Sequence, residues 1–145
     1  MIPAYDKNGN LPHGRLPYIC TWAEFSERYG YNKQRLHLLK ELRAVCNQLR
    51  NAGCRWFYVD GSFITNKLAP RDWDACWDPS GVDLDQLDNK FHSDLFRNQV
   101  KHEYSGDLFV LLPRLPGGNW VAWWQQDRRT GFRKGILKMD LGTLP

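Results

Sequence analysis

Residues 60–78 read DGSFITNKLAPRDWDACWD, and this stretch decides the fold that the sequence predicts. A β-type run at residues 56–59 leads into Gly61-Ser62, and a second apolar run begins around Asp72 and Asp74. Two carboxylates two residues apart on a strand project from the same face, because successive side chains alternate. A small-residue turn beside a same-face acidic pair is the arrangement that magnesium-dependent phosphate chemistry needs.

The composition is that of an ordinary globular protein. The chain has 145 residues, of which 42% are hydrophobic and 25% charged, and we expect residues 1–145 to form one domain. No apolar run is long enough for a membrane span and the N-terminus lacks a secretion signal, so we expect a cytoplasmic protein. Four scattered cysteines have no paired spacing, which favours small core residues over a zinc site or disulfides. They are Cys20, Cys46, Cys54 and Cys76.

The charge is mildly basic and unevenly distributed. The formal net charge is +4, which does not by itself require a nucleic-acid partner. The cations that concentrate in the last third are Arg114, Arg128, Arg129, Arg133, Lys134 and Lys138. Two interpretations stay open, a solvated basic face and a surface that binds a polyanion.

Two helices have clear boundaries in the sequence. Thr21 and Glu24 form a capping-box pattern, which predicts a short helix over residues 22–29 that stops at Gly30. A long helix is expected over about residues 33–52, because apolar side chains recur at steps of three and four. A further helical stretch, continuous or broken, is expected from about residue 84 to 104. Residues 1–20 are rich in Pro and Gly and predict an irregular arm that packs over the domain.

The strands predict the fold class. They are expected over residues 55–60, 72–77, 107–112, 120–126 and 132–141, with a hairpin connection at 127–131. The first connection is too short for a parallel crossover, so we expect antiparallel or sharply re-entrant strands joined through a helical turn at residues 64–68. The order of elements predicts an α+β (mixed α/β) domain. Its mixed sheet of about five strands would carry the long helix and a C-terminal β-hairpin.

The central motif resembles that of a known superfamily. Gly61-Ser62, followed after nine residues by Asp72-Trp73-Asp74, is similar to the signature of nucleotidyltransferases with the DNA-polymerase-β-like fold. The segments at 10–12, 126–131 and 134–136 resemble a small bacterial and phage branch of minimal nucleotidyltransferase-like proteins. This resemblance covers nearly the whole chain.

The resemblance implies a magnesium-dependent nucleotidyltransferase. Such an enzyme moves a nucleoside monophosphate from an NTP such as ATP to a hydroxyl group of an RNA, a protein or a small molecule. Asp72 and Asp74 would be catalytic ligands of two Mg²⁺ ions, while Gly61 and Ser62 would bind phosphate. Several minimal nucleotidyltransferases belong to toxin–antitoxin or defence modules, which implies a role of that kind and a protein partner.

A third carboxylate is expected on a neighbouring strand, where it would activate the acceptor hydroxyl. Asp107 is preferred by chain order, and Asp127 is the alternative; either residue can instead serve a turn or cap. Many relatives carry Arg directly after the Gly-Ser pair to hold the triphosphate, whereas this chain has Phe63. That departure leaves the retention of catalysis open.

Other cations are candidates for the missing phosphate ligand. Lys67 and Arg71 are the nearest to the Gly-Ser pair in sequence, and Lys134 precedes Gly135 in the C-terminal part. We expect Lys67 and Lys134 to bind the nucleotide.

An alternative interpretation keeps the fold without the chemistry. A catalytically weak or inactive module would bind nucleic acid or a protein through a basic, aromatic C-terminal hairpin. Its residues would be Trp120, Trp123, Trp124, Arg128, Arg129 and Arg133. Tryptophans on strands are also ordinary core residues, so the exposure of Trp123 or Trp124 would favour this alternative.

Overall fold

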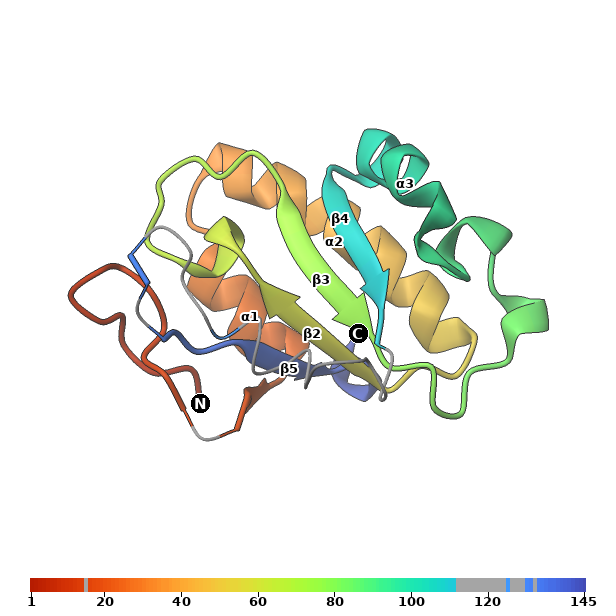
Figure 1. The fold of residues 1–145 in the computed structure, drawn as a ribbon, viewed down its shortest axis with the longest axis horizontal. Coiled ribbons are helices and arrows are strands. Elements are labelled where there is room, and N and C mark those ends of the chain that lie inside the picture. The colour runs from red at the N-terminus through yellow and green to blue at the C-terminus, as the bar shows by residue number, and fades with distance from the viewer. Residues whose placement is uncertain (15, 112–124, 126–129, 132) are drawn as a thin grey trace.

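A five-stranded mixed sheet forms the centre of the protein. The computed structural model describes residues 1–14, 16–111, 125, 130–131 and 133–145. The strands follow the order β1-β5-β2-β3-β4 (Figure 1), which confirms the expected α+β class. The elements are β1 Tyr18–Cys20, α1 Trp22–Tyr29, α2 Lys33–Asn51, β2 Trp56–Asp60, β3 Trp73–Trp77, α3 Arg97–Tyr104, β4 Gly106–Val110 and β5 Leu137–Asp140.

Local capping explains where the first two helices begin. The Thr21 hydroxyl accepts a hydrogen bond from the backbone N–H of Glu24 at 3.1 Å, and the Glu24 carboxylate accepts one from the N–H of Thr21 at 2.8 Å. The Asn32 side chain caps α2 by accepting from the N–H of Arg35 at 2.9 Å. Both predicted helices are confirmed, with α2 ending one residue earlier than expected.

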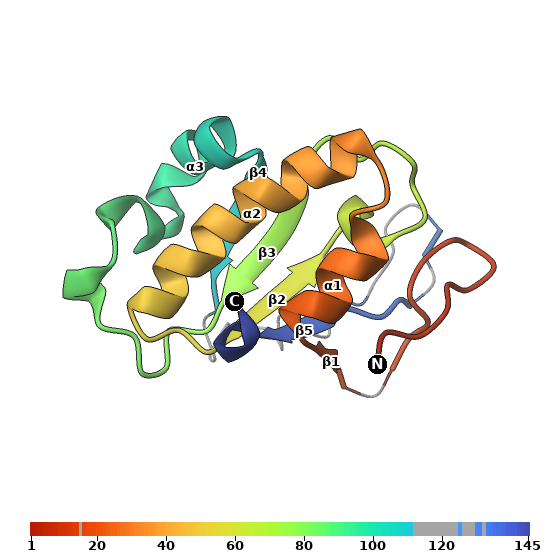
Figure 2. The same cartoon turned by 180° about the vertical axis from the view of Figure 1, so that it is seen from behind.

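Helices α1 and α2 cover one face of the sheet (Figure 2). Alternate strand residues point toward these helices, and the fully buried ones are Phe57, Val59, Trp73, Ala75, Leu137 and Met139. The four cysteines are all buried free thiols, as the sequence predicts for small core residues. Within the described residues, no helix combines the length and apolar character needed to cross a bilayer.

The predicted antiparallel pairing of the central strands is confirmed for β2 and β3, while β4 runs parallel to β3. The arm is not irregular throughout, because residues 18–20 form β1, which pairs in parallel with β5. A three-residue strand is too short to show an alternating pattern in the sequence. The helical turn that was expected at residues 64–68 lies instead at Ser62–Ile64. The predicted strand 120–126 and hairpin 127–131 fall mostly outside the described residues.

The expected helical stretch from residue 84 is broken until α3 begins. Three 3₁₀ turns precede α3, and each is opened by a side chain that accepts a hydrogen bond from the backbone N–H two residues later. Asp83, Asp88 and Ser93 make these bonds. Short polar side chains compete in this way with the helical hydrogen-bond pattern.

A fully buried arginine connects α2 to the loop between β2 and β3. The Arg35 guanidinium donates to the carbonyl oxygens of Phe63 at 2.6 Å, Thr65 at 2.8 Å and Lys67 at 2.6 Å. Its Cζ also lies 4.8 Å from the centre of the Tyr31 ring. Arg35 therefore fixes the backbone that follows Gly61-Ser62.

We expect Arg35→Met to destabilise the protein strongly. The variant keeps the aliphatic stem but removes the donors of three carbonyl groups, and a buried acceptor without a donor costs about 1–3 kcal/mol. The free energy of unfolding, measured by urea denaturation, should fall by at least about 3 kcal/mol. Arg43→Met, at an exposed position of α2, is the matched control and should cost less than about 1 kcal/mol. Equal losses in the two variants would contradict the role of Arg35.

Candidate active site

Three carboxylates occupy facing positions on three neighbouring strands. Asp60 is paired with Asp74 in the antiparallel register of β2 and β3, and Asp74 is paired with Asp107 in the parallel register of β3 and β4. Directly facing residues project from the same side of a sheet. Trp73 and Ala75 point toward the helices, so the three aspartates lie on the opposite face. The end of β2 and the beginnings of β3 and β4 thus bring the acids to one edge.

Asp72 joins this group from the residue directly before β3. Lys101 Nζ, from α3, lies 3.3 Å from Asp72 Oδ2 and 3.2 Å from Asp107 Oδ2. The predicted pair Asp72 and Asp74 and the preferred third acid Asp107 therefore gather at one place. The alternative third acid, Asp127, lies outside the described residues.

Burial and like charges act together on Asp74. Its pKa is raised to about 7, first because burial penalises the ionised form and then because Asp72, Asp107 and Asp60 repel its charge. Lys101 opposes the shift, and its own pKa is raised by hydrogen bonds to Asp107 and Asp72. The group holds more negative charge than this lysine offsets.

Two further cations approach the acids. Arg97 Nε lies 3.7 Å from Asp107 Oδ1, and Lys134 Nζ lies 2.8 Å from Asp60 Oδ1. The Lys134 and Asp60 side chains are each only 13% exposed, so solvent screens this ion pair less than one on the open surface. Lys134 reaches the edge because β5, which it precedes, runs antiparallel to β2.

Gly61 is required by its backbone and by its neighbour. Its φ of 79° lies in the left-handed region, and a Cβ atom at this position would collide with the Asp74 carboxylate. Ser62 then opens the short turn Ser62–Ile64. The Gly-Ser pair thus passes against the acidic group without a side chain between them.

Phe63 does not point toward the acids. Its ring is fully buried and lies 5.7 Å from that of Phe25 and 5.9 Å from that of Tyr29. In this structure the side chain at position 63 enters the aromatic core. Phe63 therefore supplies packing and no contact to the pocket.

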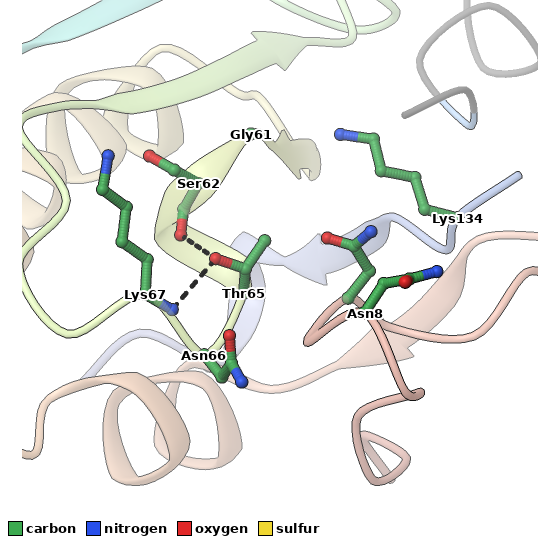
Figure 3. Close-up of a pocket in the computed structure, with 8 residues that line it drawn as sticks. Asn8, Gly61, Ser62, Thr65, Asn66, Lys67 and Lys134 are labelled. Carbon is green, nitrogen blue, oxygen red and sulfur yellow. Dashed lines mark hydrogen bonds between the residues drawn. The ribbon is translucent and has the colours of Figure 1, made fainter. Parts of the chain in front are cut away.

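A polar pocket of about 420 Å³ lies beside the Gly-Ser pair. The predicted phosphate ligands Gly61, Ser62, Lys67 and Lys134 all line it (Figure 3). The other lining residues are Asn8, Asn10, Thr65 and Asn66. The structure therefore joins the predicted residues in two adjacent groups, the acids at the sheet edge and the cations around this pocket.

Several residues of the site are not predicted by the sequence motifs. Lys101 and Arg97 approach Asp107 from α3, and Asp60 lies in register with Asp74. The signal for Asp60 was its position directly before Gly61, at the end of a strand. For Asn8 the local sequence gave no signal, because only the folded chain brings the arm to the pocket.

The acids offer the hard oxygen ligands that Mg²⁺ prefers. Among the described residues, no three His, Cys, Asp or Glu side chains are already arranged to hold a metal ion. Lys101 contacts two of the three predicted acids and stands in for part of the positive charge that such an ion would bring. The donor chemistry thus fits Mg²⁺, and Lys101 would have to release Asp72 and Asp107 for both to become ligands.

Comparison with protein families gives one match. Residues 3–140 match the model of a family of unknown function, DUF6932. The chain belongs to this family. Comparisons with curated proteins and with solved structures found no match. Membership in DUF6932 therefore assigns no activity, and the case for one depends on the site itself.

The raised pKa of Asp74 predicts a pH-dependent stability. The native protein holds the Asp74 proton more tightly than the unfolded chain, so this contribution is complete below pH 3.8 and is lost as the pH rises to about 7. In metal-free buffer, the wild type should lose stability as the pH rises through this range, whereas Asp74→Asn should not. The free energy of unfolding of Asp74→Asn, relative to that of the wild type, should therefore rise by on the order of 2 kcal/mol, after allowance for partial exposure. Urea denaturation at a series of pH values measures the difference. Asp85→Asn, at an exposed position, should keep the wild-type pH dependence, and the same dependence in Asp74→Asn would contradict the crowding of charge.

Gly61→Ala should destabilise the protein more than Gly81→Ala does. Both glycines have similar positive φ angles, 79° and 75°, but a Cβ at Gly81 meets no atom within 4 Å. A positive φ strains a side chain at both positions, and of the two only a Cβ at Gly61 would collide with Asp74. We expect Gly61→Ala to cost at least about 2 kcal/mol more in urea denaturation. Equal costs for the two variants would show that Asp74 is not held against the Gly-Ser backbone.

Proposed function

We propose that this protein is a magnesium-dependent nucleotidyltransferase that transfers a nucleoside monophosphate from an NTP to a hydroxyl acceptor. The observation that carries the proposal is the cross-strand alignment of Asp74 and Asp107 beside Gly61-Ser62, with Asp72 joined to them through Lys101. The resemblance of the Gly-Ser and Asp-x-Asp motifs to the polymerase-β-like superfamily supports the same activity.

The residues divide the reaction between the two groups. Asp72 and Asp74 would hold two Mg²⁺ ions, with Asp107 as a third carboxylate, and the bound metal would stabilise charge on the attacking and leaving oxygens. Ser62, Lys67 and Lys134 would orient the phosphate tail in the pocket. Gly61 lets the backbone approach these phosphates, because it has no side chain.

The transfer step follows from this placement. The acceptor oxygen attacks the α-phosphorus and forms the new ester bond, while the bond from the α-phosphorus to the oxygen that bridges it to the β-phosphorus breaks and pyrophosphate leaves. Asp107 takes the proton of the acceptor hydroxyl. Lys101 Nζ lies 3.2 Å and Arg97 Nε 3.7 Å from the Asp107 carboxylate, and these two cations would hold it in place for this step.

The biological setting is part of the proposal. An NTP substrate and four buried free thiols agree with the cytoplasm. An RNA, protein or small-molecule acceptor and a role in a toxin–antitoxin or defence module stay predictions from the resemblance. The alternative of a binding module depends mostly on tryptophans and arginines outside the described residues. Of that set only Arg133 is described, and it is exposed.

We expect the wild type to transfer label from an NTP to an acceptor. The test incubates the protein with each α-³²P-labelled NTP, Mg²⁺ and a cell extract, and then separates the RNA, protein and small-molecule fractions. Asp72→Asn, Asp74→Asn and Asp107→Asn should each lower the transfer by on the order of a hundredfold or more. Asp85→Asn makes the same change at an exposed position and should keep full activity.

Two outcomes would contradict the proposal in different ways. Equal labelling by the wild type and the three site variants would show that these acids do not carry the reaction. Absence of label with every NTP and every fraction would favour the binding module over the enzyme. Chelation of Mg²⁺ by EDTA should abolish transfer by the wild type, and transfer that persists would exclude a role for the metal.

A further inference from the structure

A tight turn in the N-terminal arm forms part of the pocket. The Asp6 carboxylate accepts hydrogen bonds from the backbone N–H groups of Asn8 at 2.8 Å and Asn10 at 3.1 Å, and the Asp6 carbonyl accepts one from Gly9 at 3.0 Å. The Asp6 N–H in turn donates to the Asn10 carbonyl at 2.7 Å. Four hydrogen bonds within five residues give this turn, residues 6–10, a defined shape that presents Asn8 to the pocket.

The turn is held against both neighbouring walls of the pocket. The Gly9 carbonyl accepts from the N–H of Asn66 at 2.9 Å, and any side chain at Gly9 would collide with that of Asn66. On the other side, Gly135 donates its N–H to the carbonyl of Leu11 at 2.8 Å, next to Lys134. Leu11 is itself buried in the core. The arm is therefore a built wall of the pocket.

Side chains that line the pocket have hydrogen-bonding capacity to spare. Within the described part of the chain, the side chains of Asn8, Asn66 and Lys67 make no hydrogen bond or ion pair, and the Ser62 hydroxyl makes none either. Figure 3 shows Ser62 and Lys67 on one side of the pocket and Asn8 and Lys134 on the other. These groups face a common space from two sides, so a ligand that fills the pocket needs polar groups at both of its ends.

The charge of the lining selects an anion. Of the described residues that line the pocket, two are lysines and none is acidic. Lys134 shares its charge with Asp60 at 2.8 Å, whereas Lys67 is exposed. Cations on opposite sides fit an extended anion with several charged groups better than a single compact one, because each end can then meet an amino group. Amide N–H donors add hydrogen bonds to phosphate oxygens.

We propose that the turn at residues 6–10 is one wall of a polyphosphate-binding pocket, and that Asn8 determines the affinity of this pocket for the phosphate tail of a nucleoside triphosphate. The inference deepens the proposed function and rests on it for the nucleotide, but binding of the phosphate tail can be measured apart from the chemistry of the acids. Asn8 thus becomes a specificity-determining residue that the central motif does not contain.

Binding without metal tests this inference separately from catalysis. Isothermal titration calorimetry in EDTA and low salt, with the full chain, compares tripolyphosphate, ATP, AMP and a single-stranded RNA hexamer. We expect tripolyphosphate and ATP to bind with similar affinity, and AMP to bind at least about tenfold more weakly, because it lacks the charged tail. AMP binding as tight as that of ATP would overturn the assignment to the tail. If the RNA hexamer binds and ATP does not, the assignment would be overturned in favour of a nucleic-acid site.

Three variants test the role of Asn8. Asn8→Asp keeps the shape and adds a negative charge, so ATP should bind at least about tenfold more weakly. Asn8→Ala removes the amide donor and should lower the affinity for ATP by about threefold. Asn98→Asp makes the same charge change at an exposed position on α3 and should change the affinity by less than about twofold. Circular dichroism melts show whether each variant is folded.

The outcomes separate this inference from the proposed enzyme. ATP affinity of the two Asn8 variants equal to that of Asn98→Asp would overturn the role of the turn, whatever the activity. If Asn8→Asp does not fold, Asn8→Ala decides alone, and unchanged binding overturns the role. Asn8-dependent binding of ATP without any label transfer would keep the pocket and contradict the enzyme. Label transfer together with unchanged ATP binding in the Asn8 variants would keep the enzyme and contradict the role of Asn8 in the pocket.

Discussion

Repulsion among carboxylates at one edge of the sheet is the constraint around which the protein is arranged. Asp60, Asp74 and Asp107 are brought together by strand register, which fixes their spacing more firmly than flexible loops would. The protein offsets part of this repulsion with Lys101 from α3 and Lys134 from the segment before β5. Placement of these cations requires helix and strand positions far apart in the sequence. The acidic group thus depends on β2, β3, β4, α3 and the segment before β5.

The two faces of the sheet differ in the side chains that they carry. The face toward α1 and α2 holds the large buried side chains, and the opposite face carries the aspartates. Arg35 links the two, because it extends from α2 to the carbonyl groups behind Gly61-Ser62. The Arg35 guanidinium donates its hydrogen bonds to backbone carbonyl oxygens. The loop that lines the pocket is therefore held by a helix that contributes no side chain to the acidic group.

Local patterns made much of the fold predictable. The capping residues and the apolar period of α2 each act over a few residues, and each predicted its helix correctly. The three turns after residue 83 were harder to predict, since Asp and Ser side chains compete with the helix by hydrogen bonds that leave the apolar pattern unchanged. Lys101 and the turn at residues 6–10 depend on contacts that only the folded chain makes. No periodicity marks such residues, and they belong to the candidate site.

The docking of the arm has a consequence for the order in which the protein assembles. Tyr5 donates to the carbonyl of Thr65, 60 residues away, and Leu11 bonds to Gly135 near the other end of the chain. Contacts over such separations form late, because the loops that join them must first close. On the ribosome, Leu11 must wait until Gly135, far along the chain, has been made before it finds its partner. The pocket is therefore completed only after Lys134 and Gly135 have been made, and a chain that stops before them would display the acids with one wall unfinished.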